Sequence, residues 1–336
     1  MRALVTGATG FIGQHLVRHL AARGHEVVCL YRTPRRAEPL QELNVRLVQG
    51  TLEEPRGWAH LLGEVDVVFH LAGVLKAFSR RRFRQVNVEG TRELLQAAAQ
   101  QQQVPRVVLV SSLAAAGPSR GGTPRSESQP PRPVSVYGRS KRAAEQEASR
   151  WADQVPVTVI RPPIVFGPGD RDVLEMFRPV ARFGLHLVPT WRVPRLSLVH
   201  VDDLVPALVA AARLGQCIST CPEQDQFAGF YFVAAEEHPR YDQLGRMIAQ
   251  ALGRRRVLVL RVPGAVTWLA ALGAESVARL RRRPQIFNLD KAREARAGSW
   301  TCDPSRAMEQ LGWRPGAPLQ QRLEQTIQWY REHGWL

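Results

Sequence analysis

The segment SVYGRSKRAAE contains Tyr137 and Lys141, four residues apart near the start of a predicted helix. Side chains four residues apart meet on one face of a helix, so the pattern predicts a phenol beside an ammonium. An ordinary tyrosine has a pKa of about 10, and a neighbouring positive charge lowers that value. The pair could therefore exchange a proton near neutral pH. A chance Tyr/Lys pair on a solvated helix would give the same sequence pattern.

Lysine is rare in this chain, which makes Lys141 informative. The sequence has 46 basic residues, and only Lys76, Lys141 and Lys291 are lysines. A lysine ammonium is a compact point charge that can also hydrogen-bond to a ribose hydroxyl, whereas the arginine guanidinium is a wide planar fork. We therefore interpret Lys141 as a functional residue in a confined site next to Tyr137, where an arginine side chain would not fit.

Two hydroxyl groups, those of Ser111 and Ser112, follow the apolar run PRVVLV. The carboxyl ends of the strands in a parallel sheet border the crevice where ligands bind. A serine there can hold a substrate carbonyl while the tyrosine supplies or removes the proton. The serines therefore favour a catalytic interpretation of the Tyr/Lys pair.

The run TGATGFIG follows the first predicted strand and opens an apolar helix, with Gly7, Gly10 and Gly13 three residues apart. Glycines allow a sharp turn and a close approach of the backbone to a ligand. The helix N-terminus that follows has unpaired N–H groups and a positive dipole end, which suit a pyrophosphate. The pattern predicts a dinucleotide site, with an ordinary strand-to-helix turn as the alternative.

The second predicted strand ends in LYRTPRR, with Tyr31 and Arg32 at its end and Arg35 and Arg36 beyond. Sites that prefer NAD usually offer an acidic residue here to the adenine ribose, and NADP sites offer arginine to the 2′-phosphate. No acidic residue is present, so we predict NADP. NAD remains the alternative, because a chain so rich in arginine could carry these residues by coincidence.

Apolar strand-like runs alternate with helical patterns through the first half of the chain. Strands separated by helix-length segments predict right-handed crossovers and an α/β fold, a doubly wound parallel (Rossmann) sheet. After about residue 165 the pattern changes to a smaller, mostly helical C-terminal lobe. We expect a dinucleotide-binding domain at 1–165, to which the chain returns around 190–235, and a substrate-binding lobe at 166–336. The predicted strands lie in 2–7, 25–32, 45–50, 66–73, 105–112 and 156–163.

Composition and charge bear on whether the protein binds nucleic acid, a membrane or a metal. The 336 residues have a formal net charge of +16, but no recognisable nucleic-acid module accompanies the charge, so we expect no nucleic-acid partner. The longest apolar run, 262–274, is shorter than the roughly 20 residues that span a bilayer. The start of the chain lacks a signal-peptide pattern, which predicts a cytoplasmic protein. The four scattered cysteines do not have the spacing of a zinc site, and we expect no metal.

Together these motifs resemble the extended short-chain dehydrogenase/reductase family, also called the NAD-dependent epimerase/dehydratase family. The resemblance covers nearly the whole chain, and the ordered set of motifs is highly specific. Within the family the sequence looks most like the branch of 3β-hydroxysteroid dehydrogenase and dihydroflavonol reductase. The motifs are TGATGFIG, HLAG at 70–73, NVEGT at 87–91, SS at 111–112, YGRSK at 137–141, RPPIVFGPGD at 161–170, HVDDL at 200–204, LGWRP and WYREHGWL.

The resemblance implies roles for residues that match the family's motifs. Tyr137 would be the general acid/base, Lys141 its partner on the nicotinamide ribose, Ser112 the catalytic hydroxyl, and Asn87 a helix residue that supports the site. A homodimer formed by helix pairing is also common in the family. The implied cofactor contacts, together with those argued above, are Gly7, Thr9, Gly10, Phe11, Ile12, Gly13, Tyr31, Arg32, Arg36, Leu71, Ala72, Gly73, Tyr137, Lys141, Pro162, Pro163 and Ile164.

Three departures from the family's motifs bear on which reaction the protein catalyses. Relatives often hold adenine with an Asp after the third strand, where this chain has Gly50-Thr51-Leu52, so that contact is in doubt. Leu113 and Ala114 replace the Asp-Glu pair of the sugar-nucleotide dehydratases, which argues against dehydration. Ala116-Gly117 stands where epimerases commonly have Tyr-Gly, and the smaller side chain leaves room for a bulkier or flatter ligand.

We therefore expect hydride transfer between a nicotinamide and a secondary alcohol or ketone of an apolar cyclic or lipid-like small molecule. The apolar helix near 262–283, with a basic end at Arg281-Arg282-Arg283, could line a hydrophobic pocket, make weak contact with a membrane surface, or pack between the lobes. The alternatives to this function are an NAD-dependent sugar-nucleotide epimerase and a non-catalytic NADP-sensing module. The presence of Ser112, Tyr137 and Lys141 argues against the sensing module.

Overall fold

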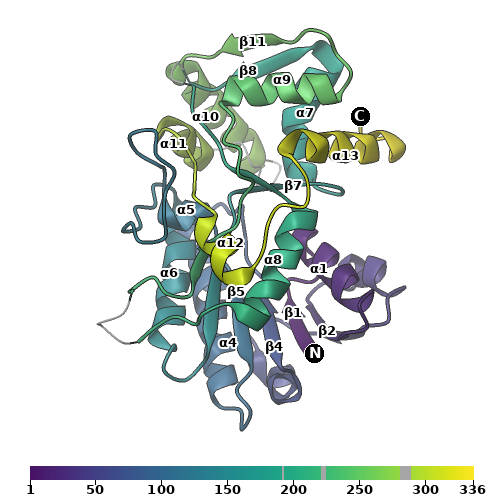
Figure 1. The fold of residues 1–336 in the computed structure, drawn as a ribbon, viewed down its shortest axis with the longest axis vertical. Helices are drawn as coiled ribbons and strands as arrows, with labels where there is room; N and C mark the ends of the chain where they lie inside the picture. Colours follow the sequence, from purple (N-terminus) through teal and green to yellow (C-terminus); the bar gives the residue numbers. More distant parts are fainter. Residues whose placement is uncertain (191–192, 221–224, 281–288) are drawn as a thin grey trace.

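A seven-stranded parallel sheet forms the centre of the computed structural model, which describes residues 1–190, 193–220, 225–280 and 289–336. The strand order is β10-β6-β5-β4-β1-β2-β3, and every neighbouring pair is parallel (Figure 1). The predicted doubly wound sheet is confirmed, and each predicted run contains one strand. The strands are β1 (Arg2–Thr6), β2 (Glu26–Tyr31), β3 (Arg46–Gln49), β4 (Val67–His70), β5 (Arg106–Val110), β6 (Val157–Arg161) and β10 (Phe230–Phe232).

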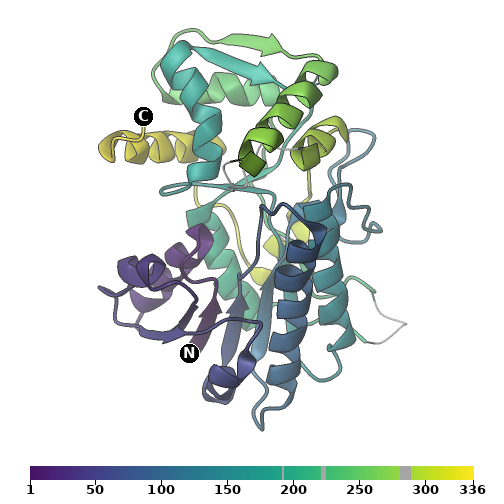
Figure 2. The same cartoon turned by 180° about the vertical axis from the view of Figure 1, so that it is seen from behind.

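Helices cover both faces of this sheet, as continuously apolar strands require. One face packs against α1, α8 and α12, and the other against α4 and α6 (Figures 1 and 2). The bounds of these helices are α1 (Phe11–Ala21), α4 (Gly90–Ala99), α6 (Val136–Arg150), α8 (Val201–Leu214) and α12 (Ser305–Leu311).

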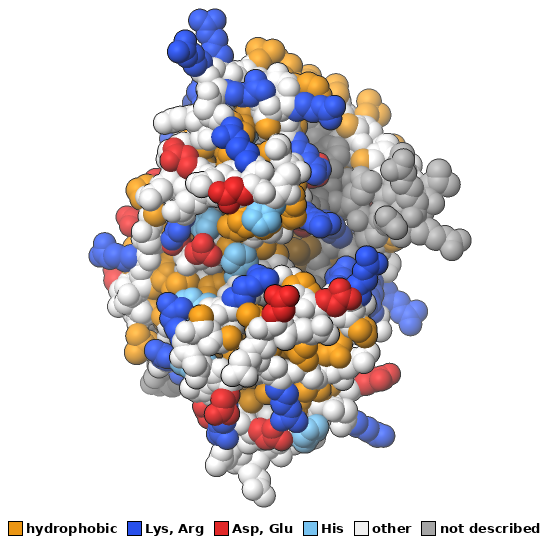
Figure 3. All heavy atoms as spheres, turned by 90° about the vertical axis from the view of Figure 1, so that its right-hand side faces the viewer, with side chains coloured by type: hydrophobic (Ala, Val, Ile, Leu, Met, Phe, Trp, Pro, Cys, Tyr) orange, Lys and Arg blue, Asp and Glu red, His pale blue; other side chains and the backbone are white. Residues whose placement is uncertain are grey.

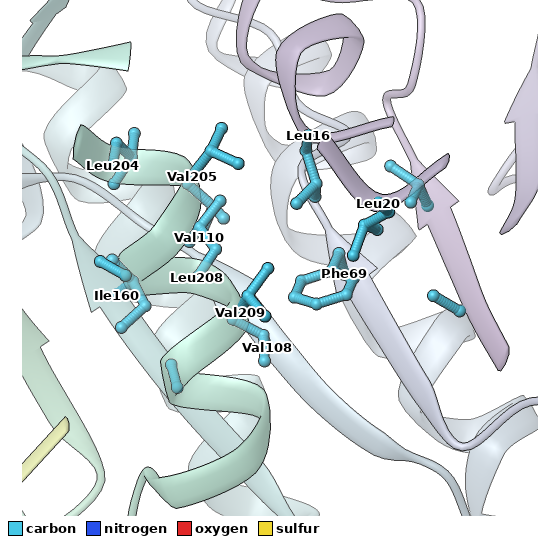
Figure 4. Packing of buried hydrophobic residues seen from close by; sticks show 14 of the residues in the cluster. Leu16, Leu20, Phe69, Val108, Val110, Ile160, Leu204, Val205, Leu208 and Val209 are labelled. Atoms are coloured by element: carbon cyan, nitrogen blue, oxygen red, sulfur yellow. The ribbon is translucent and has the colours of Figure 1, made fainter. Parts of the chain in front are cut away.

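The core under α8 and α1 fixes both helices to the middle of the sheet. Leu204 and Leu208 of α8 and Leu16 of α1 are fully buried, and they pack over Phe69 of β4 and Ile160 of β6 (Figure 4). Burying a side chain of this size stabilises the fold by about 1.5–3 kcal/mol. The first helix after the glycine turn is therefore held rigidly against the strands that border the crevice.

The order of the strands reverses at β1, which has β2 on one side and β4 on the other. In open α/β sheets, ligands bind outside the carboxyl ends of the strands at such a switch point. This topology brings the turn after β1 next to the turn after β4. It therefore sets the place of the candidate site.

The rest of the C-terminal part forms a smaller, mostly helical lobe with its own core, at the upper end of the molecule in Figure 1. Phe177, Ile248 and Tyr330, from three different helices, are buried in that core. Its elements are α7 (Arg171–Phe183), α9 (Tyr241–Ala251), α10 (Gly264–Leu280), α11 (Leu289–Arg296), α13 (Leu319–Glu332), the pair β8 (Leu185–Val188) and β11 (Leu258–Arg261), and the pair β7 (Ile164–Phe166) and β9 (Leu198–His200).

The apolar helix expected near 262–283 is α10, which packs against α11. The arginines at 281–283 lie outside the described residues. Among the described helices, none combines the length and the apolar character needed to cross a bilayer.

Candidate active site

The glycine turn after β1 packs tightly against the turn after β4. Gly7 has a φ of +72°, a conformation that favours glycine. A Cβ at Gly7 would lie 2.7 Å from the backbone nitrogen of Ala72, and a Cβ at Gly13 would lie 2.2 Å from the carbonyl oxygen of Gly7. Both positions therefore require glycine. The result is a cradle made of backbone, which any side chain at Gly7 or Gly13 would disrupt.

This cradle leads into the N-terminus of α1. Gly10 is the N-cap and offers no side chain to cap the helix, and the first turn contains no acidic residue. The N–H groups of Phe11 and Ile12 therefore begin the helix without a side-chain acceptor at its cap, at the positive end of the dipole. Together with the half-buried Thr9, these residues could hold the pyrophosphate of a dinucleotide.

The start of α6 lies directly against α5 (Leu113–Ala116), the short helix that follows β5. A Cβ at Gly138 would lie only 2.3 Å from the carbonyl oxygen of Ala114. Glycine at this position is therefore what allows the two backbones to approach. Ser112 is the N-cap of α5 and Tyr137 lies in the first turn of α6, so this approach brings their hydroxyl groups within hydrogen-bonding distance of each other.

The structure separates the roles of the two serines. The Ser111 hydroxyl is buried and donates a hydrogen bond of 2.6 Å to Glu145. Glu145 in turn forms two hydrogen bonds of 2.8 Å with the fully buried Arg161. Ser112 accepts a hydrogen bond from the backbone of Ala114 and stays partly exposed. Ser111 thus belongs to a buried structural network, and Ser112 is the hydroxyl that faces Tyr137.

Lys141 extends into the same crevice from the next turn of α6. Its ammonium is buried and donates a hydrogen bond of 2.7 Å to the carbonyl oxygen of Val110, at the end of β5. A Cβ at Gly73 would lie 3.7 Å from this nitrogen, so the charge lies beside the turn after β4. Burial lowers the pKa of Lys141 to about 8, and the nearby carboxylate of Glu145 acts in the opposite direction.

The pKa of Tyr137 differs from the sequence expectation. We expected the Lys141 ammonium to lower it, but burial raises the pKa of the phenol above its usual range. The hydrogen bond with Ser112 opposes this shift, and the negative charge of Glu294 adds to it. The expectation was wrong because it considered one neighbouring charge and not desolvation. In this arrangement the phenol keeps its proton at neutral pH.

Asn87 supports the turn after β4 from a distorted helix. It lies in η4 (Arg84–Glu89), a π-helical segment between α3 (Arg80–Phe83) and α4. Its side chain accepts a hydrogen bond from the N–H of Val74 and donates to the carbonyl oxygen of Val74 and to Ser140. Such wide turns occur frequently at functional sites. Asn87 therefore ties the segment after Gly73 to α6, which carries Tyr137 and Lys141.

The predicted contacts at the ends of the cofactor lie along the same edge of the sheet. Tyr31 ends β2, and Arg32 and Arg36 just beyond it are exposed and form no ion pair with any described residue. Leu71, Ala72 and Gly73 follow β4 directly. Pro162, Pro163 and Ile164 follow β6, and the carbonyl oxygen of Pro162 accepts a hydrogen bond from Leu113 at the start of α5.

Sequence reasoning missed the contribution of α11 to this site. Asp290 accepts hydrogen bonds from the N–H groups of Val136 and Tyr137, at 2.9 and 3.1 Å, and so caps α6 from the other lobe. Glu294, one turn further along α11, is close enough to affect the pKa of the phenol. More than 150 residues separate these acids from Tyr137, and no local pattern marks them.

A cavity of about 370 Å³ adjoins α10 and α11 in this lobe. It is lined by Gly264, Ala265, Trp268 and Arg296. The indole N–H of Trp268 is buried and has no hydrogen-bond partner in the part of the chain that the structure describes. The cavity thus combines small and aromatic residues with one basic residue, Arg296, next to the helix that caps α6.

Comparisons with known proteins identify the family of the chain. The sequence model of the NAD dependent epimerase/dehydratase family matches residues 3–218, more than half of the chain. The chain belongs to this family. The predicted resemblance is thereby confirmed, and the glycine turn and the Tyr/Lys helix lie within the matched residues.

Relatives within the epimerase/dehydratase family act on different substrates. The ceramide reductase of Caulobacter vibrioides is 34% identical, over 99% of this chain and 95% of the relative. The 3 beta-hydroxysteroid dehydrogenase/Delta 5-->4-isomerase of Mycobacterium tuberculosis is 28% identical, over 80% of this chain and 74% of the relative. The solved structure of MoeE5 in complex with UDP-glucuronic acid and NAD is 25% identical, with a TM-score of 0.75, and the match covers 99% of this chain and 100% of that one.

Proposed function

We propose that this protein is an NADP(H)-dependent oxidoreductase that interconverts a ketone and a secondary alcohol on an apolar, lipid-like or cyclic small molecule. One observation carries the proposal: Tyr137 faces Ser112, and the buried Lys141 extends from the next turn of α6 to the end of β5, beside a backbone cradle suited to a dinucleotide. We also propose that residues 1–165 hold the cofactor, that 166–336 supply the substrate pocket, and that the protein works in the cytoplasm.

Each residue of the site has a distinct part in this reaction. The nicotinamide, when bound, supplies or accepts a hydride at its C4 carbon. Tyr137 gives its hydroxyl proton to the oxygen of the substrate during reduction and takes it back during oxidation. Ser112 hydrogen-bonds to that oxygen and orients it. Lys141 carries a positive charge below pH 8 that stabilises the tyrosinate left after proton transfer.

The resting site has the protonation state from which the reduction of a ketone would start. The pKa of Tyr137 lies above its usual range, so the phenol is protonated at neutral pH. The negative charge of Glu294 and the burial of the ring both hold the proton on the phenol. A proton donor at neutral pH is what the reduction of a ketone needs.

Three observations support an apolar substrate. Ala116-Gly117 stands where epimerases commonly carry Tyr-Gly, so no tyrosine ring restricts the ligand from that position. The cavity next to α11 is lined mainly by small and aromatic groups. In addition, the names of the relatives from Caulobacter and Mycobacterium include a ceramide and a steroid.

The preference for NADP rests on Arg32 and Arg36. Both guanidinium groups are exposed at the end of β2, and neither forms an ion pair with a described residue. Such groups suit the 2′-phosphate dianion that distinguishes NADP from NAD. Because the family description and the MoeE5 complex both name NAD, the preference needs a direct comparison of the two cofactors.

The second candidate function is an NAD-dependent sugar-nucleotide epimerase. The specific observation in its favour is the similarity to MoeE5, which was solved with UDP-glucuronic acid and NAD. An epimerase would retain its cofactor through purification and would interconvert sugar nucleotides without net consumption of NADH or NADPH.

A screen of cofactor consumption distinguishes these functions. Purified protein is mixed with NADPH or NADH and with panels of long-chain keto-lipids, steroid ketones, flavonoids and sugar nucleotides. We expect NADPH to be consumed with an apolar ketone and not with a sugar nucleotide. Turnover with sugar nucleotides alone would contradict the proposal, and binding of NADPH without turnover on any ketone would indicate a sensing module.

A further inference from the structure

The helix α10 turns its apolar side chains toward solvent. Val266, Leu269 and Leu272 are exposed, Leu269 to 70%. The side chain of Thr267 is buried instead and hydrogen-bonds to the carbonyl oxygens of Pro189 and Pro263. The helix is apolar on most sides, so it buries Ala271 on one side and still exposes large apolar side chains on another.

The adjoining pair of strands continues this apolar surface. In the register of β8 and β11, Leu258 lies opposite Leu185 and Leu260 lies opposite Leu187, so these four side chains share one face of the ribbon. Leu187, Leu258 and Leu260 are exposed to 46%, 61% and 42%. The opposite face carries the buried His186, whose ring packs against Tyr241 of α9.

Phe183, at the end of α7 just before β8, is also exposed. We define the apolar face of this lobe as Phe183, Leu187, Leu258, Leu260, Val266, Leu269 and Leu272. Figure 3 shows hydrophobic side chains along the upper right edge of the molecule, where this lobe lies, near basic side chains at the top. Large exposed apolar side chains gathered on one lobe are typical of an interaction site.

Arginines border the apolar face, and the one acidic residue of α10, Glu275, lies beyond Leu272 toward the C-terminal end of that helix. The segments 182–189 and 254–274 contain five arginines and no Asp or Glu. All five guanidinium-bearing residues are exposed, and none forms an ion pair with a described residue. The arginines are Arg182, Arg254, Arg255, Arg256 and Arg261.

We propose that this apolar face docks on the surface of an anionic lipid bilayer. Exposed leucines and a phenylalanine can enter the boundary between headgroups and acyl chains, while the arginines contact anionic headgroups. The combination of apolar and basic groups is what reversible membrane attachment needs, because neither signal alone binds firmly. The proposal does not depend on the proposed reaction.

The charges argue against a second copy of the chain as the occupant of this face. In a two-fold symmetric dimer the same surface meets itself, so the arginines around one apolar face would approach those around the other. The five arginines outnumber Glu275, the one acidic residue of α10, so this repulsion would not be neutralised. An anionic lipid surface supplies the opposite charge and is therefore the better match.

The other side of α10 gives such docking a use. Gly264 and Trp268 line the cavity of about 370 Å³, one turn apart on the helix that carries Val266 and Leu269. A membrane-bound protein would thus hold its cavity close to the lipid phase, where apolar ketones concentrate.

The test is co-sedimentation of the purified full chain with vesicles. One set contains equal parts of phosphatidylcholine and phosphatidylglycerol, and the other contains phosphatidylcholine alone. We expect binding to the anionic vesicles and much weaker binding to the neutral ones. Raising the salt from about 0.1 M to about 1 M shortens the Debye length from about 10 Å to about 3 Å and should release most of the protein.

Two variants separate the apolar and the basic contributions. Leu258→Gln combined with Leu269→Gln should weaken partitioning at least tenfold at every salt concentration. Arg255→Gln combined with Arg256→Gln should weaken partitioning to anionic vesicles about 25-fold, at about fivefold per arginine, and should reduce the effect of salt. All four positions are exposed, so the fold should be retained, which circular dichroism and thermal melting check.

The matched control is Arg213→Gln combined with Leu214→Gln, at the C-terminal end of α8, where Leu214 is exposed to 62%. It should bind vesicles as the parent protein does. The proposal fails if the parent binds neither vesicle, or if the control weakens binding as much as the variants of the face. It also fails if sedimentation shows a dimer that Leu258→Gln with Leu269→Gln dissociates, because the face would then belong to a second copy.

Discussion

The close contact between α5 and α6 gives a sharp test of how the site is positioned. In Gly138→Ala the new Cβ would lie 2.3 Å from the carbonyl oxygen of Ala114, whereas ordinary contacts of a Cβ begin at 3.4 Å. The two helices must therefore separate by about 1 Å, as overpacked elements do. Ser112 and Tyr137 lie on opposite sides of this contact, so their hydroxyl groups should move apart by a similar distance.

The expected effects follow from that displacement. A misplacement of about 1 Å near reacting groups costs on the order of 10²-fold in rate. Overpacking should lower the free energy of unfolding by about 1–3 kcal/mol, offset by up to about 1 kcal/mol from the higher helix propensity of alanine. Both effects are measurable on the same purified variant.

The assay compares kcat and the melting temperature of Gly138→Ala with those of Gly273→Ala. Gly273 also lies within a helix, but a Cβ there would meet nothing within 4 Å. This control should melt at the same temperature or slightly higher and keep the turnover of the parent. If Gly138→Ala retains kcat within twofold and melts no lower than the parent, the close approach does not position Tyr137 and the reasoning is refuted.

Three further perturbations test ionisable side chains that the structure buries. Burial lowers the pKa of Lys141 to about 8, so kcat/KM should fall as the pH rises through about 8 and the ammonium loses its proton. Lys141→Met should lower turnover by about 10²-fold at neutral pH and should remove this decline at high pH. An unchanged pH profile in Lys141→Met would contradict the role assigned to Lys141. Burial also lowers the pKa of His70 from 6.5 to about 3. As the pH falls, the unfolded chain therefore binds a proton at His70 before the folded protein does, and the free energy of unfolding should drop by up to about 5 kcal/mol between pH 6.5 and pH 3. Urea titrations should find a smaller drop in His70→Gln. Glu145→Ala leaves the buried Arg161 without its partner and should lower the free energy of unfolding in urea by about 3–5 kcal/mol. Glu175→Ala removes one partner of an exposed ion pair and should lower it by less than about 1 kcal/mol. Equal losses in the two variants would refute the importance of the buried pair.

The sequence predicted the sheet well because its signals are local. The six apolar runs matched the first six strands, and the glycines at 7, 10 and 13 marked the turn after β1. Both features depend on residues that are neighbours in the chain. The order of the strands was not predicted and comes from the structure.

Long-range packing escaped prediction. Asp290 and Glu294 reach Tyr137 from α11, and no periodicity links residues so far apart in sequence. The raised pKa of Tyr137 likewise comes from burial, which depends on the assembled fold. The helix α10 was recognised as apolar, but its sequence is apolar on most sides, so only the structure shows which residues face solvent.

The most direct test of the catalytic role of Tyr137 uses NADPH that carries deuterium at C4 of the nicotinamide. Mass spectrometry of the alcohol formed from an apolar ketone should find one deuterium on the carbinol carbon. Tyr137→Phe should lower the yield of this product by about 10²–10⁴-fold while it binds NADPH with unchanged affinity. Undiminished deuterium transfer by Tyr137→Phe would contradict the account.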